Sequence, residues 1–250
     1  MAGLAGACKS EGMTEVMKSI RLEMIHSKAS LESRLLLARK AGFDAVELNS
    51  QGYGRLEMLN ALTKTGMKVI SVYHSENWTG SISSTDENKR QSAVDAVLKT
   101  VETAEMYDAD FIQLLAGKDI EQPGEDGKKS LLRSLRQINA SLNGNVRLLL
   151  QNFSGKNMSS PAFMESILSQ FNSNSPGLCL DTEMATVNGG LKQWYSLLKK
   201  YVSKVDLDES SFGGVSSLIF HAQGLRCISL DASGGAESRI LRLGNLACIN

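Results

Sequence analysis

The chain has 250 residues, of which 42% are hydrophobic, and its 27 lysines and arginines balance 27 aspartates and glutamates. A chain of this length can bury the core of one large α/β domain, so we expect a single domain. The balanced charge argues against a protein that binds nucleic acid or an anionic membrane, and it favours a small ligand. No uncharged apolar run is long enough to span a membrane.

The start of the chain and the cysteines bear on its location. The apolar segment before Lys9 and Glu11 is too short for a secretory signal. We interpret residues 1–17 as a mobile arm. The 4 cysteines are Cys8, Cys179, Cys227 and Cys248, and no two of them form a CxxC pair. This scattered pattern predicts a reduced, cytoplasmic protein.

Short apolar runs alternate with longer amphipathic segments along the chain. The apolar runs predict strands at residues 19–26, 43–48, 67–74, 110–116, 146–153, 178–181, 202–207 and 225–231. The amphipathic segments predict helices at residues 30–41, 55–65, 85–107, 128–142, 161–171, 190–201, 215–223 and 236–243. Ser30 can cap the first of these helices, and Gly42 can end it.

Strict alternation of eight strands with eight helices predicts a single (β/α)8 TIM barrel, which we expect to cover residues 18–250. The competing architecture is a doubly wound open sheet. That fold usually carries a glycine-rich phosphate loop after its first strand, whereas residues 27–33 (SKASLES) contain no glycine. The barrel is therefore the favoured fold.

The strongest chemical signal is Asp181, which ends an apolar run in the stretch GLCLDTEMATVNGG (residues 177–190). A carboxylate at the end of a buried strand needs a metal ion, a cation or several hydrogen-bond donors around it. Two structural roles fit the same pattern: Asp181 could cap the following turn, or it could belong to a structural ion pair.

Polar residues stand at the ends of the other predicted strands as well. They are His26, Glu47, His74, Gln113, Gln151, Asp206 with Asp208, and Asp231. Strand ends are often polar because they meet water, but in a barrel they also build the functional face. The alternation of side chains places Gln151 on the same face as Leu149, and Asp231 on the same face as Ser229. One inward-facing polar group per strand is typical of a ligand site.

Five segments, taken in order, resemble the xylose-isomerase-like superfamily of sugar isomerases, epimerases and AP endonuclease family 2 barrels. They are GFDAVELN, GMKVISVYH, VRLLLQN, GLCLDTEMA and WYSLLKKYVSKVDLDE, and the resemblance runs over residues 19–231. It implies a divalent cation held by a glutamate, an aspartate, a histidine and a glutamate on the fifth to eighth strands. It also implies proton or hydride transfer on a hydroxy-carbonyl sugar.

Carried over to this chain, the four metal positions are Gln151, Asp181, Asp206 and Asp231, of which only Asp181 keeps the family's residue. With Glu183 as a possible fifth member, the set consists of oxygen ligands and suits Mg²⁺, Mn²⁺ or Ca²⁺. The altered ligands are equally compatible with no metal at all. Gln151 cannot accept a proton near neutral pH, which argues against a symmetric two-base mechanism.

The resemblance also suggests residues that contact the substrate. Asp181, Glu183 and His74 are the predicted catalytic groups. The predicted substrate-binding residues are Glu47, His26, Trp78 and Gln113. For His74 and Trp78, a hydrogen-bonded histidine beside a packed tryptophan is an equally good interpretation. We assign His221 to structure and Lys156 to a solvated loop.

The leading hypothesis is an isomerase or epimerase that acts on a small sugar or polyhydroxy carbonyl compound. The second is a non-catalytic barrel that serves as a binding or scaffold protein, because the fifth-strand glutamate and both family histidines are absent. The third is a metal-free lyase or isomerase that uses clustered aspartates as acid and base. The substrate stays open because specificity in this fold resides in loops, and a homo-oligomer is compatible with all three hypotheses.

Overall fold

The computed structural model describes residues 16–25, 29–73, 82–115, 124–143, 145–153, 159–172, 175–208 and 225–231. Within these residues eight strands form a closed barrel in sequence order, and β1 pairs with β8 to complete it. Every neighbouring pair is parallel. The barrel predicted from the alternation of strands and helices is therefore confirmed.

The strands are short, as is usual for a barrel of this type. They are β1 (Met17–Arg21), β2 (Ala45–Asn49), β3 (Lys68–Tyr73), β4 (Phe111–Leu114), β5 (Arg147–Gln151), β6 (Gly177–Asp181), β7 (Val202–Asp208) and β8 (Cys227–Asp231). The register shifts between Val46 and Glu47 on β2, and between Leu178 and Cys179 on β6.

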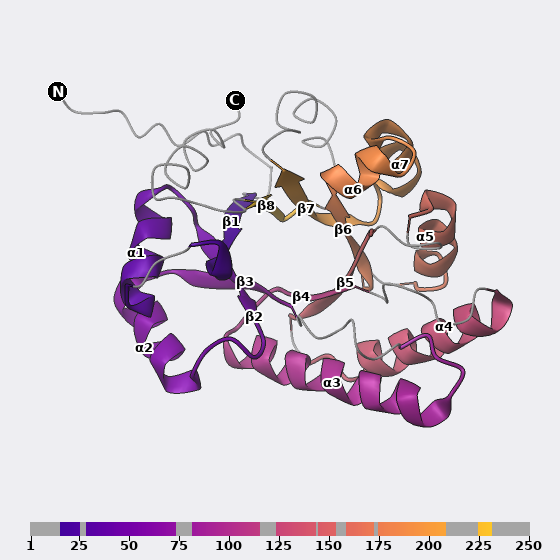
Figure 1. Ribbon diagram of the computed structural model, residues 1–250, viewed down its shortest axis with the longest axis horizontal. Coiled ribbons are helices and arrows are strands. Elements are labelled where there is room, and N and C mark those ends of the chain that lie inside the picture. Colours follow the sequence, from indigo (N-terminus) through magenta and orange to yellow (C-terminus); the bar gives the residue numbers. More distant parts are fainter. Residues whose placement is uncertain are drawn as a thin grey trace.

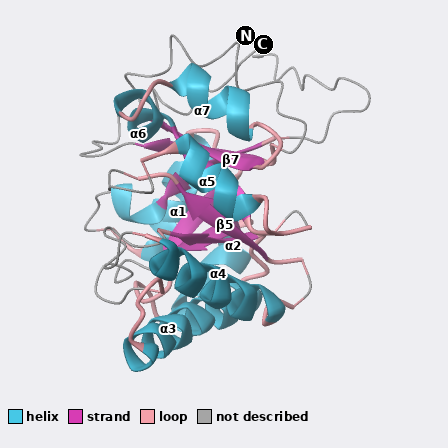
Figure 2. Ribbon diagram, turned by 90° about the vertical axis from the view of Figure 1, so that its right-hand side faces the viewer, coloured by secondary structure: helices cyan, strands magenta, loops and turns pink. Residues whose placement is uncertain are grey.

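Helices surround the barrel (Figure 1), and the view turned by 90° shows the strands enclosed between them (Figure 2). The helices are α1 (Leu31–Lys40), α2 (Arg55–Thr65), α3 (Glu87–Met106), α4 (Glu125–Ala140), α5 (Pro161–Leu168), α6 (Thr182–Val187) and α7 (Leu191–Leu198), and a 3-10 turn, η1, covers Leu22–Met24. As predicted, Ser30 caps α1 by accepting a hydrogen bond from the Ser33 N–H, and Gly42 follows the helix with a φ of 87°.

Two differences from the prediction concern the first strand and the segment that follows the sixth strand. The first strand ends at Arg21, not at His26, because the chain turns into η1 and the Ile25 N–H bonds to the Leu22 carbonyl oxygen. It begins at Met17, the last residue of the predicted arm. A short helix, α6, which was not predicted, follows Asp181 directly. The helices predicted at residues 215–223 and 236–243 lie outside the described residues.

The main apolar core fills the space between the barrel and its helices, where side chains such as Leu35, Val97, Leu135 and Trp194 are buried. A second, smaller cluster lies inside the barrel. It consists of Ala45, Ile70, Phe111, Leu149, Cys179 and Cys227. Both of these cysteines are free thiols, as the absence of paired cysteines in the sequence predicts.

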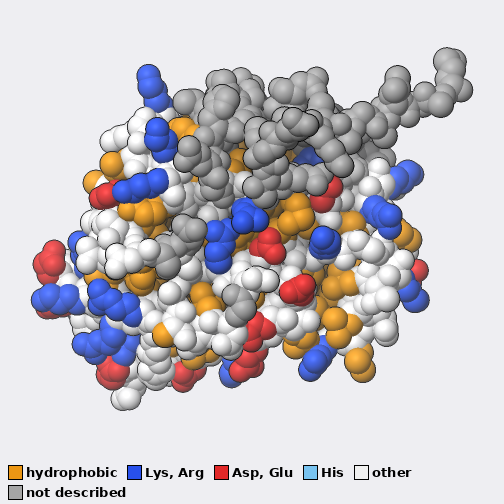
Figure 3. Space-filling model, turned by 180° about the vertical axis from the view of Figure 1, so that it is seen from behind, with side chains coloured by type: hydrophobic (Ala, Val, Ile, Leu, Met, Phe, Trp, Pro, Cys, Tyr) orange, Lys and Arg blue, Asp and Glu red, His pale blue; other side chains and the backbone are white. Residues whose placement is uncertain are grey.

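The surface shows no segregation of charge on the face drawn in Figure 3, where basic and acidic side chains are interspersed. Among the described helices, none is both long and apolar enough to cross a lipid bilayer.

Candidate functional site

The alternation of side chains along the strands builds a polar layer on top of the inner apolar cluster. Glu47, Gln113, Gln151, Asp181 and Ser229 each follow, by two residues, a member of that cluster on the same strand. Side chains two residues apart on a strand point to the same side, so these polar groups face the barrel interior nearer the carboxyl ends. The carboxyl ends of the strands therefore surround a polar interior.

At the centre of this layer lies Lys204 of β7, whose side chain is entirely buried. Its Nζ lies 3.1 Å from Oε2 of Glu47, donates to Oε1 of Gln113 at 3.0 Å, and forms an ion pair with Asp206. Burial alone would disfavour the ammonium, but the attraction of Asp206 keeps the pKa of Lys204 well above its usual value. Lys204 is thus a fixed positive charge inside the barrel.

A second internal cation, Arg21 of β1, lies above Lys204. Its Nη2 donates to Oδ2 of Asp206 at 3.0 Å, and its Nε lies 3.9 Å from Oε2 of Glu47. The guanidinium lies over the ring of Tyr73, 5.2 Å from the ring centroid. Since 26% of the Arg21 side chain is exposed, this cation reaches the solvent-facing end of the barrel.

These two cations balance two carboxylates. Burial would raise the pKa of Asp206, but Lys204 and Arg21 outweigh this effect and hold that pKa below its ordinary value. Glu47 lies between the same two cations and also accepts a hydrogen bond from the Ser19 hydroxyl at 2.8 Å. The four charged groups together carry no net charge.

Two amides connect this network to Asp181. Gln113 donates through Nε2 to Oε1 of Gln151 at 2.6 Å, and Gln151 donates through Nε2 to Oδ2 of Asp181 at 3.1 Å. Both amides are buried, so their orientation is fixed by these partners. The amide nitrogen of Gln151, not its carbonyl oxygen, therefore faces Asp181.

Asp181 combines a structural contact with a half-buried position at the pocket. Its Oδ1 accepts a hydrogen bond from the Met184 N–H at 2.9 Å and so caps α6, which confirms the capping role considered from the sequence. Asn152 fixes the backbone of Asp181 by accepting from its N–H at 2.7 Å and donating to its carbonyl oxygen at 2.9 Å. Burial, together with the negative charge of Asp206, raises the pKa of Asp181 to about 6.

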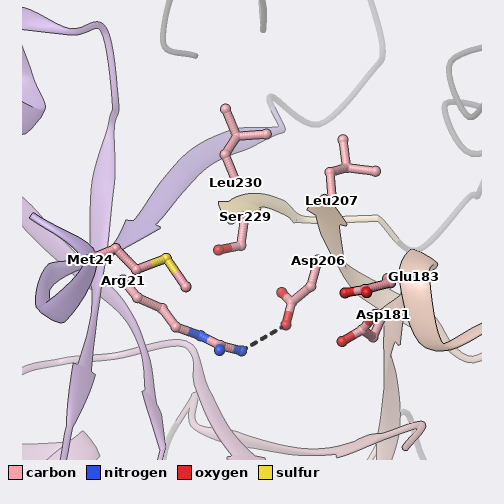
Figure 4. Close-up of a pocket in the computed structure, with 8 residues that line it drawn as sticks. All are labelled: Arg21, Met24, Asp181, Glu183, Asp206, Leu207, Ser229 and Leu230. Carbon is pink, nitrogen blue, oxygen red and sulfur yellow. Dashed lines mark hydrogen bonds and ion pairs between the residues drawn. The ribbon is translucent and has the colours of Figure 1, made fainter. Parts of the chain in front are cut away.

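A pocket opens above this network, at the carboxyl ends of the strands (Figure 4). It contains about 320 Å³ of empty space, part of it open to solvent. Its lining residues are Arg21, Met24, Asp181, Glu183, Asp206, Leu207, Ser229 and Leu230. Charged and hydroxyl groups thus share the pocket with three apolar side chains, which suits a small polar ligand with a carbon skeleton.

Comparison with known proteins agrees with this architecture. The family model described as xylose isomerase-like TIM barrel matches residues 35–215. The chain belongs to this family. No curated protein matches the sequence.

Several solved structures share the fold of this xylose isomerase-like barrel. An L-ribulose 3-epimerase superimposes with a TM-score of 0.77 at 16% identity, over 94% of this chain and 88% of the other. For a D-psicose 3-epimerase with D-fructose the TM-score is 0.75 at 12% identity, over 92% of this chain and 96% of the other. An AP endonuclease of family 2 from Brucella melitensis superimposes with a TM-score of 0.75 at 14% identity, over 92% of this chain and 99% of the other. At these identities the likeness shows the fold alone.

The xylose isomerase-like barrel brings most of the described predicted site residues into one network. Asp181, Asp206 and Glu183 line the pocket, whereas Glu47 and Gln113 lie buried beneath it. The last residue of β8, Asp231, pairs with Asp208 at the end of β7, but its side chain is not described. The remaining candidates, His26, His74 and Trp78, lie outside the described residues, and their roles stay predictions. Lys156 and His221, which were assigned to a solvated loop and to structure, lie outside the described residues as well.

The three predicted metal positions with described side chains, Gln151, Asp181 and Asp206, do not fit a divalent cation. Both carboxylate oxygens of Asp206 face protein cations, and Gln151 directs its amide nitrogen toward Asp181. Within the described part of the chain, no three His, Cys, Asp or Glu side chains are grouped so that they could hold a metal ion. We therefore derive no chemical step through a metal.

Sequence reasoning missed Arg21, Lys204, Asn152 and Ser229 as site residues. For the two cations, the sequence did contain a signal in their spacing along the strands. Lys204 precedes Asp206 by two residues in the apolar strand VSKVDL, and Arg21 follows Ser19 by two residues on β1. The same alternation that placed Gln151 inside the barrel places these basic side chains there too.

Proposed function

We propose that this barrel is an isomerase or epimerase that moves a proton at a carbon next to the carbonyl group of a small sugar or other hydroxy-carbonyl compound. The observation that carries the proposal is that two carboxylates, Asp181 and Glu183, face one pocket at the carboxyl ends of the strands. The fold is shared with an L-ribulose 3-epimerase and with a D-allulose 3-epimerase in complex with D-allulose, which supports this class of substrate.

Proton transfer of this kind needs a base that can also return the proton as an acid. We assign this role to Asp181, because it is held in place by Asn152 and Met184 and lines the pocket. A pKa raised to about 6 suits a group that both accepts and donates a proton near neutral pH. Glu183 is the exposed carboxylate beside it and is available for the second transfer.

The test is solvent exchange. Wild-type protein is incubated with D-fructose or D-allulose in D₂O, and deuterium at the carbons beside the carbonyl is measured by NMR. We expect exchange with wild type, a loss of at least about 100-fold in Asp181→Asn, and no loss in Asp95→Asn, an exposed aspartate on α3. Wild-type rates in Asp181→Asn, or no exchange by wild type with either ketose, would contradict the proposal.

A barrel that binds its ligand without turnover is the second candidate. It is favoured by the fact that both carboxylate oxygens of Asp181 accept hydrogen bonds, from Gln151 and from the Met184 N–H. Binding of a ketose, detected by saturation-transfer NMR and without any exchange, would support this candidate. Release of water from the sugar would instead point to the metal-free lyase.

A further inference from the structure

Arg21 is the cation that lines the pocket, and its contacts with described residues do not use all of its N–H donors. Its Nη2 bonds to Asp206 and its Nε lies near Glu47, but among the described residues its Nη1 has no hydrogen-bond partner. A guanidinium carries five N–H donors and is not deprotonated in proteins. As far as the described residues go, one edge of Arg21 is therefore available to an oxygen atom of a ligand in the pocket that Arg21 lines (Figure 4).

The surroundings of Arg21 hold it in a single position. The guanidinium stacks on the ring of Tyr73, and the Tyr73 hydroxyl donates to Oε2 of Glu23 at 2.8 Å. The other carboxylate oxygen of Glu23 accepts a hydrogen bond from the Asn49 N–H at 3.3 Å. A donor that is fixed before the reaction stabilises developing negative charge without the cost of reorganisation.

The charge distribution also disfavours a metal ion at this place. Lys204 and Arg21 already neutralise Glu47 and Asp206, so a divalent cation beside Asp206 would meet two positive charges. Moreover, the amide of Gln151 faces Asp181 with its nitrogen. Protein cations thus occupy both carboxylate oxygens of Asp206, one of the four positions where the resemblance implies an ion ligand.

We propose that Arg21 binds the carbonyl oxygen of the ligand and supplies, in place of a divalent metal ion, the positive charge that stabilises an enolate there. The inference rests on the proposed function and identifies the ligand more closely. The ligand is an α-hydroxy carbonyl compound whose carbonyl oxygen becomes negatively charged during proton transfer. A stable molecule with a negative oxygen beside a hydroxyl group should accordingly bind better than its neutral counterpart.

The test compares the affinities of D-glycerate and its neutral amide, D-glyceramide, by isothermal titration calorimetry or NMR. Wild type should prefer glycerate by at least about tenfold, the effect of one charge-assisted contact. Arg21→Gln should lose this preference, whereas Arg21→Lys should retain part of it because it keeps the charge without the fork of donors. Arg133→Ala, which alters an exposed arginine on α4, should behave as wild type.

Equal affinity of wild type for the two probes, or an unchanged preference in Arg21→Gln, would overturn the inference. If Arg21→Gln does not fold, the ¹⁵N NMR signal of the Arg21 guanidinium in wild type decides instead. It should shift on addition of glycerate and stay unchanged with glyceramide, and a failure to shift would count against Arg21. Because these are binding measurements, an absence of deuterium exchange would contradict the proposed function without deciding this inference.

Discussion

The ammonium of Lys204 lies 3.1 Å from Oε2 of Glu47, and both side chains are completely buried inside the barrel. Two buried charges are stable only when they are paired and hydrogen-bonded, and here Asp206, Gln113 and Ser19 supply the remaining partners. The pair lies beneath the residues that line the pocket. Its two charges compensate each other inside the barrel without a bound ion.

Removal of the Lys204 charge should destabilise the fold strongly. Lys204→Met leaves the carboxylates of Glu47 and Asp206 without their shared cation, and we expect a loss of about 3–5 kcal/mol in the free energy of unfolding. Urea denaturation measures this loss. The control is Lys64→Met, which breaks the exposed pair with Glu32 and should cost less than about 1 kcal/mol. Equal effects of the two substitutions would contradict the role given to Lys204.

The stability of the protein should depend on pH through Asp181. The pKa of this carboxyl rises from 3.8 in the unfolded chain to about 6 in the fold, so the folded state binds the proton more tightly. Stability from this group is therefore present at low pH and is lost as the pH rises through about 6. The unfolding free energy of Asp181→Asn minus that of wild type should therefore increase by on the order of 2 kcal/mol when the pH is raised from 4 to 7.5. A difference that stays constant over this range would refute the raised pKa.

Asn152 should matter for stability although it does not line the pocket. It is buried and exchanges two hydrogen bonds with the backbone of Asp181, joining the end of β5 to the end of β6. Asn152→Ala leaves two buried backbone groups unpaired, and we expect a loss of about 2–4 kcal/mol. Asn60→Ala, on the exposed face of α2, is the matched control and should change stability by less than about 0.5 kcal/mol. A loss at Asn152 as small as that of the control would disagree with this contact.

Gly177 begins β6 in a place with no room for a side chain. An added Cβ would lie 3.0 Å from Leu149 Cδ2, 3.1 Å from Ser203 Oγ and 3.3 Å from the Tyr201 carbonyl oxygen. We expect Gly177→Ala to lower the unfolding free energy by about 1–3 kcal/mol. At Gly54, the N-cap of α2, the added Cβ would come no closer than 3.8 Å to Glu57, so Gly54→Ala should cost less than about 1 kcal/mol, the difference between glycine and alanine at a helix N-cap. Thermal unfolding of both variants checks the contrast, and a neutral Gly177→Ala would speak against the close packing of β6 on its neighbours.

The fold could be predicted from the sequence because hydrophobic periodicity and helix caps are local signals. Ser30 and Gly42 bound α1 as expected, and the helix predicted at residues 55–65 has the same bounds in the structure. The short helix α6 was missed because its six residues follow β6 without a loop: Asp181 is both the last residue of β6 and the N-cap of α6. A segment of this length carries too little periodicity to be distinguished from a loop.

The site was predicted less completely, for a physical reason. Among the predicted strand-end residues that the structure describes, Gln151 contacts Asp181, and Asp181 lines the pocket together with Asp206. The side chains of His26, His74, Asp208 and Asp231 are not described, so for them the expectation stays a prediction. Lys204 was missed because its side chain starts lower in the barrel than the strand end, and Arg21 was missed because β1 ends at Arg21 and not at the predicted His26. Lys204 begins level with Cys179 and Cys227, yet its Nζ reaches the carboxylate of Asp206. The pairing partners of a side chain, unlike strand parity, follow from the closed barrel and not from local sequence.

Substitution of protein cations for a metal ion is tested most directly by the manganese content of the purified protein. Protein incubated with Mn²⁺ and passed through a desalting column is analysed by electron paramagnetic resonance and elemental analysis, for wild type, Asp181→Asn and Asp206→Asn. We expect wild type to retain far less than one ion per chain, because Arg21 and Lys204 already hold the carboxylate of Asp206. One tightly bound Mn²⁺ per wild-type chain, lost in both variants, would contradict this expectation.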